Sequence, residues 1–277
     1  MIPAAFDYER ASSLEEALSL LAEHGDEAKL LAGGHSLLPL MKLRLATPSV
    51  HVDLGRLEEL AYVRDEGERL AIGSLTTHHD LSRNALVRRH LPVLAHVAGQ
   101  IGDPQVRHRG TIGGSLAHGD AASDLPAVVL ALGGTLVAEG RRGRREIEAS
   151  EFHEGFLETA LSFDEVLVEI RLRKPAHTGF GFEKLTKRAQ DWAIVGAVAA
   201  RRGDLPGGVG VALVNMAPVP VRAVSVESAL ADGVPIAEAA QHADAEADPS
   251  ADINASVAYR RHLSHVLVRR ALEKALS

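Results

Sequence analysis

The sequence predicts a mixed chain of helices and strands in two domains, on three observations. Helical and strand-like segments alternate over the first sixty residues, apolar segments lead into the pairs Gly33-Gly34 and Gly113-Gly114, and turn formers cluster at 174–179. Strands that alternate with helices are typical of an α/β unit. Because turn formers after a strand mark a boundary, we expect domains at residues 1–175 and 178–277.

The first expected helix carries a capping box. Ser13-Leu14-Glu15-Glu16 places serine at the N-cap and glutamate three residues later, and apolar residues follow at helical spacing as far as Gly25. Beyond it we expect strands at 29–32 and 49–54, with a helical turn at 37–41 between them.

The middle of the chain is predicted to combine strands with helices. We expect strands at 70–73, 135–139, 145–148 and 166–172, a hairpin turn at 140–144, a short helix after Thr77, and helices at 91–101 and 124–132.

Apolar runs after residue 179 predict two strands, at 192–200 and 209–214. An Ala- and Asp-rich segment at 229–252 is expected to be helix or loop. The chain closes on a predicted amphipathic helix with Tyr259, Leu263, Val266 and Leu267 on one face.

Composition excludes several classes of function. A net charge of −7 and an aromatic content of 4% argue against a nucleic-acid surface. The absence of cysteine excludes disulfides, a thiolate nucleophile and a Cys-ligated iron–sulfur cluster on this chain. No histidine pattern predicts a metal site. Without a signal-peptide pattern or an apolar run of membrane-spanning length, we expect a cytoplasmic protein with no membrane span.

Both glycine pairs have features of anion-binding loops. Glycine lets backbone N–H groups approach a ligand closely and form a small concavity, and a helix that begins there adds its dipole. Neither loop carries the lysine of a nucleoside-triphosphate site. Each pair alone is also consistent with an ordinary tight turn. Two such loops together could hold the two phosphates of a dinucleotide.

The flanks of these loops make a family resemblance specific. The matching segments are Ala32–Arg44, Gln105–His118 with Asp120 and Asp124-Leu125-Pro126, Lys184 with Arg188 and Asp191-Trp192-Ala193, and Tyr259-Arg260-Arg261 with Arg269–Leu272. Over nearly its whole length the chain resembles the FAD-binding medium subunit of the carbon monoxide dehydrogenase and xanthine dehydrogenase family, the molybdenum hydroxylases. Two glycine pairs in order with matching flanks are much stronger evidence than either alone.

The resemblance implies an α+β fold: a PCMH-type, vanillyl-alcohol-oxidase-like FAD-binding domain followed by a small C-terminal domain of antiparallel sheet and helices. It implies noncovalent FAD, a molybdenum-cofactor large subunit and a [2Fe-2S] small subunit as partners, and a dimer of heterotrimers. The implied FAD-contacting residues are Lys29, Leu30, Leu31, Ala32, Gly33, Gly34, His35, Ser36, Ile101, Thr111, Ile112, Gly113, Gly114, Ser115, Asp124, Leu167, Lys184 and Trp192.

Three of these residues have a structural alternative. Asp124 suits both a helix N-cap and a contact with the sugar or ribityl hydroxyls of FAD. Lys184 is either a solvated lysine or a positive charge near the flavin pyrimidine. Trp192 is either a core residue or a shield over the isoalloxazine ring.

The implied function is electron transfer through FAD, from a [2Fe-2S] subunit to an external acceptor. No acid/base pair stands out in the sequence, as expected when substrate is oxidised on a partner subunit. Two alternatives remain: a self-contained FAD-dependent oxidase or dehydrogenase, and a cofactor-free scaffold that retains the fold. Carbon monoxide, an N-heterocycle and an aldehyde all stay open as substrates of the complex.

Overall fold

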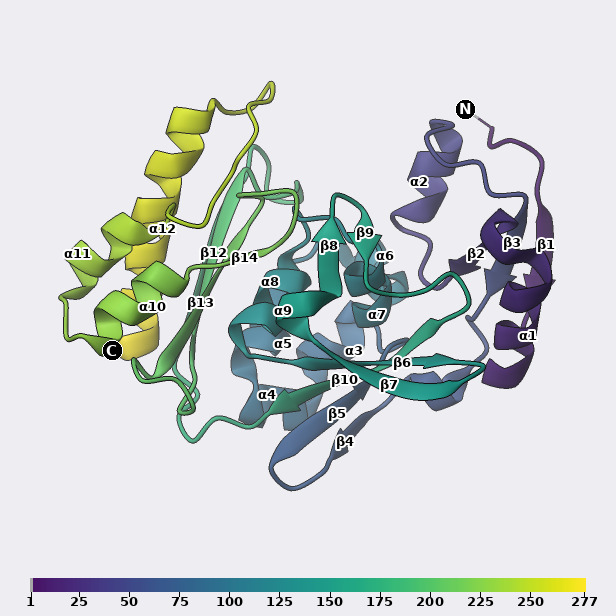
Figure 1. The fold of residues 1–277 in the computed structure, drawn as a ribbon, viewed down its shortest axis with the longest axis horizontal. Helices are drawn as coiled ribbons and strands as arrows, with labels where there is room; N and C mark the ends of the chain where they lie inside the picture. The colour runs from purple at the N-terminus through teal and green to yellow at the C-terminus, as the bar shows by residue number, and fades with distance from the viewer. Residues whose placement is uncertain (1) are drawn as a thin grey trace.

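Three units, each built on one of the larger β-sheets, follow one another along the molecule (Figure 1). The computed structural model describes residues 2–277. The N-terminal unit lies at one end, the middle of the chain at the centre, and the C-terminal unit at the other end. Among residues 2–277 no helix is both long and apolar enough to cross a bilayer.

The N-terminal unit is a small parallel sheet with helices. It comprises β1 (Asp7–Arg10), α1 (Leu14–His24), a 3-10 turn (Gly25–Glu27), β2 (Ala28–Leu31), α2 (Leu37–Lys42) and β3 (Val50–Asp53), with strand order β1-β3-β2. The predicted N-cap and end of α1 are confirmed: Ser13 Oγ accepts from the Glu16 N–H at 3.1 Å, and Gly25 ends α1 at φ +54°. The predicted capping box is only half formed, because the Glu16 carboxylate accepts from the Ser12 N–H at 2.6 Å instead of from that of Ser13. Sequence reasoning missed β1, whose four residues are all exposed.

The middle unit packs a layer of helices on a five-stranded antiparallel sheet of order β4-β5-β10-β6-β7. After a 3-10 turn (Glu58–Leu60), its elements are β4 (Val63–Asp65), β5 (Arg69–Gly73), α3 (His78–Arg83), α4 (Ala85–His90), α5 (Pro92–Ala98), α6 (Pro104–Arg109), α7 (Ile112–Ala117), α8 (Asp124–Ala131), β6 (Thr135–Gly140), β7 (Gly143–Glu148), α9 (Ala149–Phe152), β8 (His153–Gly155), β9 (Glu158–Thr159) and β10 (Val166–Arg173). The helix predicted at 91–101 is shorter, because the chain turns after Ala98 through Gly99 and through Gly102 at φ +49°.

The C-terminal unit is a four-stranded antiparallel sheet in chain order, covered by helices. It comprises β11 (Phe180–Leu185), β12 (Val195–Arg201), β13 (Val209–Val214), β14 (Val221–Arg222), α10 (Val224–Ala231), α11 (Ile236–Ala239), a 3-10 turn (Ala240–His242) and α12 (Val257–Leu276). Side chains on β12 alternate between two cores: Val195 and Ala197 pack with α12, whereas Val198 packs with the helices of the middle unit. Burial on both faces explains the continuous apolar run.

The predicted face of the last helix is partly wrong. Leu263 and Leu267 are buried as expected, but Tyr259 is 46% exposed and Val266 is only partly buried. The buried stripe begins instead at Arg260, which is 3% exposed and forms an ion pair with Asp252. A buried arginine takes this place because charged and carbonyl partners lie within its reach.

Two glycines let helices lie directly on the C-terminal sheet. A Cβ at Gly181 would lie 2.1 Å from the Ala271 carbonyl oxygen of α12, and one at Gly210 would lie 2.0 Å from the Ala131 carbonyl oxygen of α8. Such contacts are far inside van der Waals distance, so even alanine would push the helix away from the sheet.

We expect Gly181→Ala to lower the free energy of unfolding by about 1–3 kcal/mol, because overpacking forces the backbone to move. Urea denaturation measures this loss. Gly203→Ala is the matched control, since a Cβ there meets nothing within 4 Å, and it should change stability by no more than about 0.5 kcal/mol. Equal stability of the two variants would contradict the close approach.

Candidate functional site

A cavity of about 540 Å³ lies between the three units. The first glycine loop, the second glycine loop, the start of α8, β10, β11 and the segment before β12 all contribute to its lining. A volume of this size suits a small-molecule or cofactor site. Of the residues predicted to contact FAD, all but Ile112 line it.

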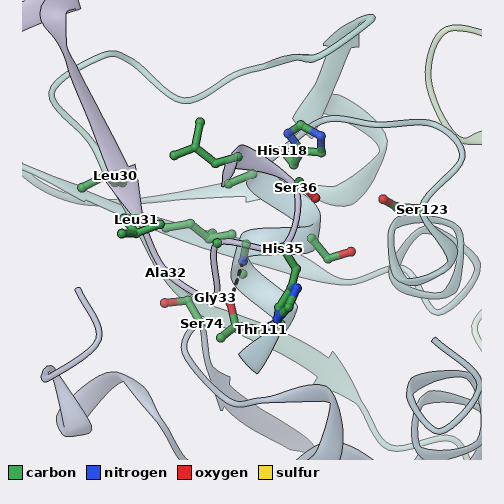
Figure 2. A pocket seen from close by; sticks show the side chains of 18 of the residues that line it. Leu30, Leu31, Ala32, Gly33, His35, Ser36, Ser74, Thr111, His118 and Ser123 are labelled. Carbon is green, nitrogen blue, oxygen red and sulfur yellow. Dashed lines mark hydrogen bonds between the residues drawn. The ribbon is translucent and has the colours of Figure 1, made fainter. Parts of the chain in front are cut away.

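The first glycine loop presents four consecutive backbone N–H groups, from Gly33 to Ser36. Within residues 2–277 none of the four donates a hydrogen bond to another protein group. Gly34 has φ +74°, a conformation that suits glycine. Figure 2 shows Gly33, His35 and Ser36 among the residues around the cavity. Consecutive N–H groups without protein acceptors are a feature of the backbone concavities that bind anions.

The second glycine loop is different, because its N–H groups are already used. Gly113 N–H donates to the Ser74 carbonyl at 2.8 Å, Gly114 N–H to Thr111 Oγ1 at 3.1 Å, and Ser115 N–H to the Thr111 carbonyl at 3.0 Å. This loop opens α7, with Thr111 as its N-cap (Figure 2). Its glycines therefore allow close approach, and its free polar groups are hydroxyls such as that of Ser115 rather than backbone N–H groups.

The two loops are packed directly against each other. A Cβ at Gly33 would lie 2.2 Å from the carbonyl oxygen of Arg109, and one at Gly114 would lie 3.8 Å from Ala32 Cβ. The predicted meeting of the two loops is therefore found. Ile112 lies behind them as a fully buried core residue, and its N–H donates to the Thr76 carbonyl at 3.0 Å.

Asp124 and Lys184 form a buried ion pair at the cavity. Lys184 Nζ lies 2.8 Å from Asp124 Oδ2, and the two side chains are 11% and 5% exposed. Lys184 is thus not a solvated lysine. Asp124 is the first residue of α8 and Ser123 is its N-cap, so the predicted N-cap role is wrong by one position.

One oxygen of this pair has no partner. Burial raises the pKa of Asp124, and the Lys184 ammonium opposes that rise. Asp124 Oδ1 is buried and accepts no hydrogen bond from any described residue. Since an unsatisfied buried acceptor costs about 1–3 kcal/mol, its presence beside a cavity fits a ligand that carries hydroxyl groups, as FAD does.

Apolar side chains complete the cavity wall. Leu167 is 5% exposed on β10 and Ile101 is partly buried, while Trp192 is 54% exposed and also lines the cavity. The core alternative for Trp192 is therefore wrong. Its half-exposed indole offers a flat, largely apolar surface at the cavity.

Sequence reasoning missed several cavity residues that come from neighbouring segments. Ser74, His78 and Ser123 line the site, and Figure 2 labels Ser74, His118 and Ser123 around it. His78 is held by its N–H, which donates to the Gly110 carbonyl at 2.9 Å, and burial lowers its pKa to about 4. It is therefore neutral near pH 7. Ser74 directly follows the predicted strand at 70–73, and His78 begins the short helix predicted after Thr77. These two positions are the signals that could have found them.

Comparison with known proteins identifies the family. The family model described as "FAD binding domain in molybdopterin dehydrogenase" matches residues 4–175, and "CO dehydrogenase flavoprotein C-terminal domain" matches residues 180–275. The chain belongs to this flavoprotein family. The implied cofactor, FAD, is confirmed, as is membership of an oxidoreductase family.

Relatives match along the whole chain. The carbon monoxide dehydrogenase medium chain of Hydrogenophaga pseudoflava is 41% identical over 282 residues, covering 99% of this chain and 98% of its own. Subunit alpha of the 6-hydroxypseudooxynicotine dehydrogenase complex of Paenarthrobacter nicotinovorans is 38% identical over 284 residues, covering 100% and 96%.

A solved structure supports the same assignment. The carbon monoxide dehydrogenase of Hydrogenophaga pseudoflava that lacks the Mo-pyranopterin moiety contains a chain that superposes with a TM-score of 0.96 at 41% identity, covering 100% of this chain and 99% of that one. The expected α+β fold, a FAD-binding domain followed by a C-terminal domain, is confirmed.

Removal of the Lys184 ammonium should make the free energy of unfolding depend more strongly on pH. In Lys184→Met, Asp124 stays buried without its counter-charge, so its pKa rises further in the folded protein. A carboxyl whose folded pKa is raised stabilises the fold at low pH, and it loses that contribution as pH rises from its ordinary pKa of 3.8 through the folded pKa. We expect a loss of about 3–5 kcal/mol at neutral pH, growing from acid pH at up to about 1.4 kcal/mol per pH unit.

The double variant Asp124→Asn/Lys184→Met is the control, because it contains no buried charge to neutralise. It should be more stable than Lys184→Met at neutral pH and show none of this added pH dependence. Urea denaturation at a series of pH values measures both. A single variant whose stability runs parallel to that of the unaltered chain would refute the buried pair.

Proposed function

We propose that this chain is the FAD-carrying subunit of a molybdenum hydroxylase complex and that FAD lies noncovalently in the cavity between its three units. The observation that carries the proposal is the row of N–H groups from Gly33 to Ser36, which have no acceptor among the described residues and face the same cavity as the second glycine loop. A pyrophosphate supplies acceptors for such a row.

Each wall of the cavity then has a role toward the cofactor. The first glycine loop binds the pyrophosphate, and the hydroxyls of Ser36, Thr111 and Ser115 add donors. Asp124 Oδ1, which accepts no bond from the described residues, accepts from a sugar or ribityl hydroxyl. Lys184 contributes positive charge, and Trp192 covers the ring. Lys29, Leu30, Leu31, Ala32, His35, Ile101, Ile112, Gly113, Gly114 and Leu167 are included in the proposed site, Ile112 as support from the core.

FAD, when bound, accepts electrons from a [2Fe-2S] subunit and releases them to an external acceptor. The chain has no cysteine, so a Cys-ligated cluster belongs to a partner. We propose a molybdenum-cofactor large subunit and a [2Fe-2S] small subunit as partners, in a dimer of heterotrimers in the cytoplasm. The names "medium chain" and "complex subunit alpha" of two relatives support a multi-subunit assembly.

We propose that a partner subunit, and not this chain, determines which substrate the complex oxidises. Relatives named for carbon monoxide and for 6-hydroxypseudooxynicotine are 41% and 38% identical to it, over nearly the whole length in both cases. Similar sequence identities to relatives with such different substrates are expected when the subunit transfers electrons and does not bind the substrate. Turnover by the isolated chain would instead support a self-contained enzyme.

The anion cradle is tested by Gly34→Asp. Asp tolerates positive φ better than most residues, and an added Cβ meets only the ends of flexible side chains, Leu38 Cδ1 at 3.0 Å and Leu31 Cδ1 at 3.2 Å. The variant therefore places a carboxylate beside the row of N–H groups at a small cost in packing. Like charges in contact cost several kcal/mol, so we expect FAD affinity to fall at least about 100-fold, which corresponds to about 2.7 kcal/mol. The measurement is the visible flavin spectrum after FAD addition and desalting, followed by an affinity titration, on the chain and on its complex.

Gly67→Asp is the matched control, because Gly67 has φ +76° against +74° at Gly34 but lies in the β4–β5 turn with nothing within 4 Å of an added Cβ. It should retain FAD. Gly34→Asn separates charge from size and should lose much less affinity than Gly34→Asp. Equal FAD binding by Gly34→Asp and Gly67→Asp would refute the cradle. We avoid Gly33 because its contact with the Arg109 carbonyl would confuse binding with folding.

A further inference from the structure

Asn215 joins two walls of the cavity. It follows β13 directly; its N–H donates to the Ala121 carbonyl at 2.8 Å, and its side-chain Nδ2 donates to the Ala193 carbonyl at 2.7 Å. Ala121 leads into the segment that carries Asp124, and Ala193 is next to Trp192. One residue therefore links the wall with the buried ion pair to the wall with the exposed indole.

The backbone of Asn215 is held in an unusual conformation. Its φ of 61° lies in the left-handed region, which asparagine enters more readily than most residues. Such conformations persist where the surroundings enforce them. Here the N–H and the side-chain amide each have a carbonyl acceptor, on two different segments.

Arg260 supports the same link from α12. It is 3% exposed and forms an ion pair with Asp252 at 2.8 Å. Its Nη1 donates to the Ile194 carbonyl, and to the Asn215 carbonyl at 3.4 Å. The Ile194 carbonyl also accepts from Asn215 Nδ2 at 3.3 Å. A buried guanidinium is costly unless it is paired. Here Nη1 and Nη2 have partners, those of Nη1 at the base of the Trp192 segment, while the buried Nε has none among the described residues.

We propose that Asn215 and Arg260 are positioning residues of the flavin site. They hold the Trp192 segment against the start of α8 and so fix how far the indole covers the isoalloxazine ring. Neither residue lines the cavity, so they act on the ring only through the segments that they hold. This inference rests on the proposed FAD site, but its first test does not require FAD.

Trp192 is the only tryptophan of the chain and reports on its own segment. In the full chain without FAD, Asn215→Gly permits the positive φ while it removes the side-chain amide. We expect acrylamide quenching of Trp192 fluorescence to increase about twofold and its anisotropy to fall, since a segment that loses its anchors moves more on the nanosecond scale. Arg260→Met should shift both in the same direction, and Arg260→Lys should restore part of the change.

Gly181→Ala is the control for general loosening, because the atoms nearest to its added Cβ all belong to Ala271. That contact lies eleven residues along α12 from Arg260, so the substitution disturbs the far part of the helix and leaves the anchored end in place. It should leave both fluorescence readouts unchanged under native conditions. With FAD bound, iodide quenching of flavin fluorescence should rise about twofold in Asn215→Gly, because the ring loses part of its cover.

Unchanged Trp192 quenching and anisotropy in both Asn215→Gly and Arg260→Met would overturn the positioning role. An equal change in Gly181→Ala would overturn it as well, because the effect would then be unspecific. The two hypotheses fail separately: if the unaltered chain and its complex bind no FAD, the proposed function fails, while the fluorescence of Trp192 still decides whether these residues hold its segment.

Discussion

The buried ion pair between Asp124 and Lys184 is the contact on which the site depends. Asp124 begins α8 in the middle unit and Lys184 lies on β11 of the C-terminal sheet, so the pair crosses from one unit to the other. Removing two charges from water is expensive, and a hydrophobic pair of similar volume often stabilises a fold more. The arrangement keeps one carboxylate oxygen without a described partner beside the cavity. The ion pair is therefore better explained by a role in ligand binding than by a contribution to stability.

The two glycine loops have different roles in the site. The first loop leaves its N–H groups without acceptors in the described chain, whereas the second donates its own to Thr111 and Ser74. The second loop is thereby rigid, and it provides the surface on which Gly33 packs against the Arg109 carbonyl. A preorganised set of donors binds an anion without the cost of ordering a loop at the moment of binding. One loop thus supplies the donors and the other holds them in place.

Local signals in the sequence were sufficient for the elements that depend on local physics. The N-cap at Ser13, the end of α1 at Gly25 and the apolar run of β12 were all found in this way. β1 was missed because its residues are exposed and polar, and it becomes a strand only by pairing with β3. The second glycine pair was expected to donate N–H groups, but the hydroxyl of Thr111 caps a short helix there and uses one of them.

The same distinction applies to the site. Residues within the motifs were found because linear spacing places them together, whereas His78, Asn215 and Arg260 reach the site or its supporting shell through contacts between distant segments. His78 and Asn215 lie outside the motif segments that carry the family resemblance, and Arg260 lies within one, but the burial of Arg260 is set by partners on other segments. It occupies a buried helix position, which is unusual for a charged side chain.

A cavity built from three units also couples their docking to the cofactor. A ligand that contacts all three stabilises only the arrangement in which they meet, by an amount that grows with its concentration over its dissociation constant. The C-terminal unit carries no glycine motif, yet it supplies Lys184 and Trp192 to the lining. Loss of its contact with α8 would open the cavity on one side. Cofactor retention and the packing of the C-terminal sheet on the middle unit are therefore coupled equilibria.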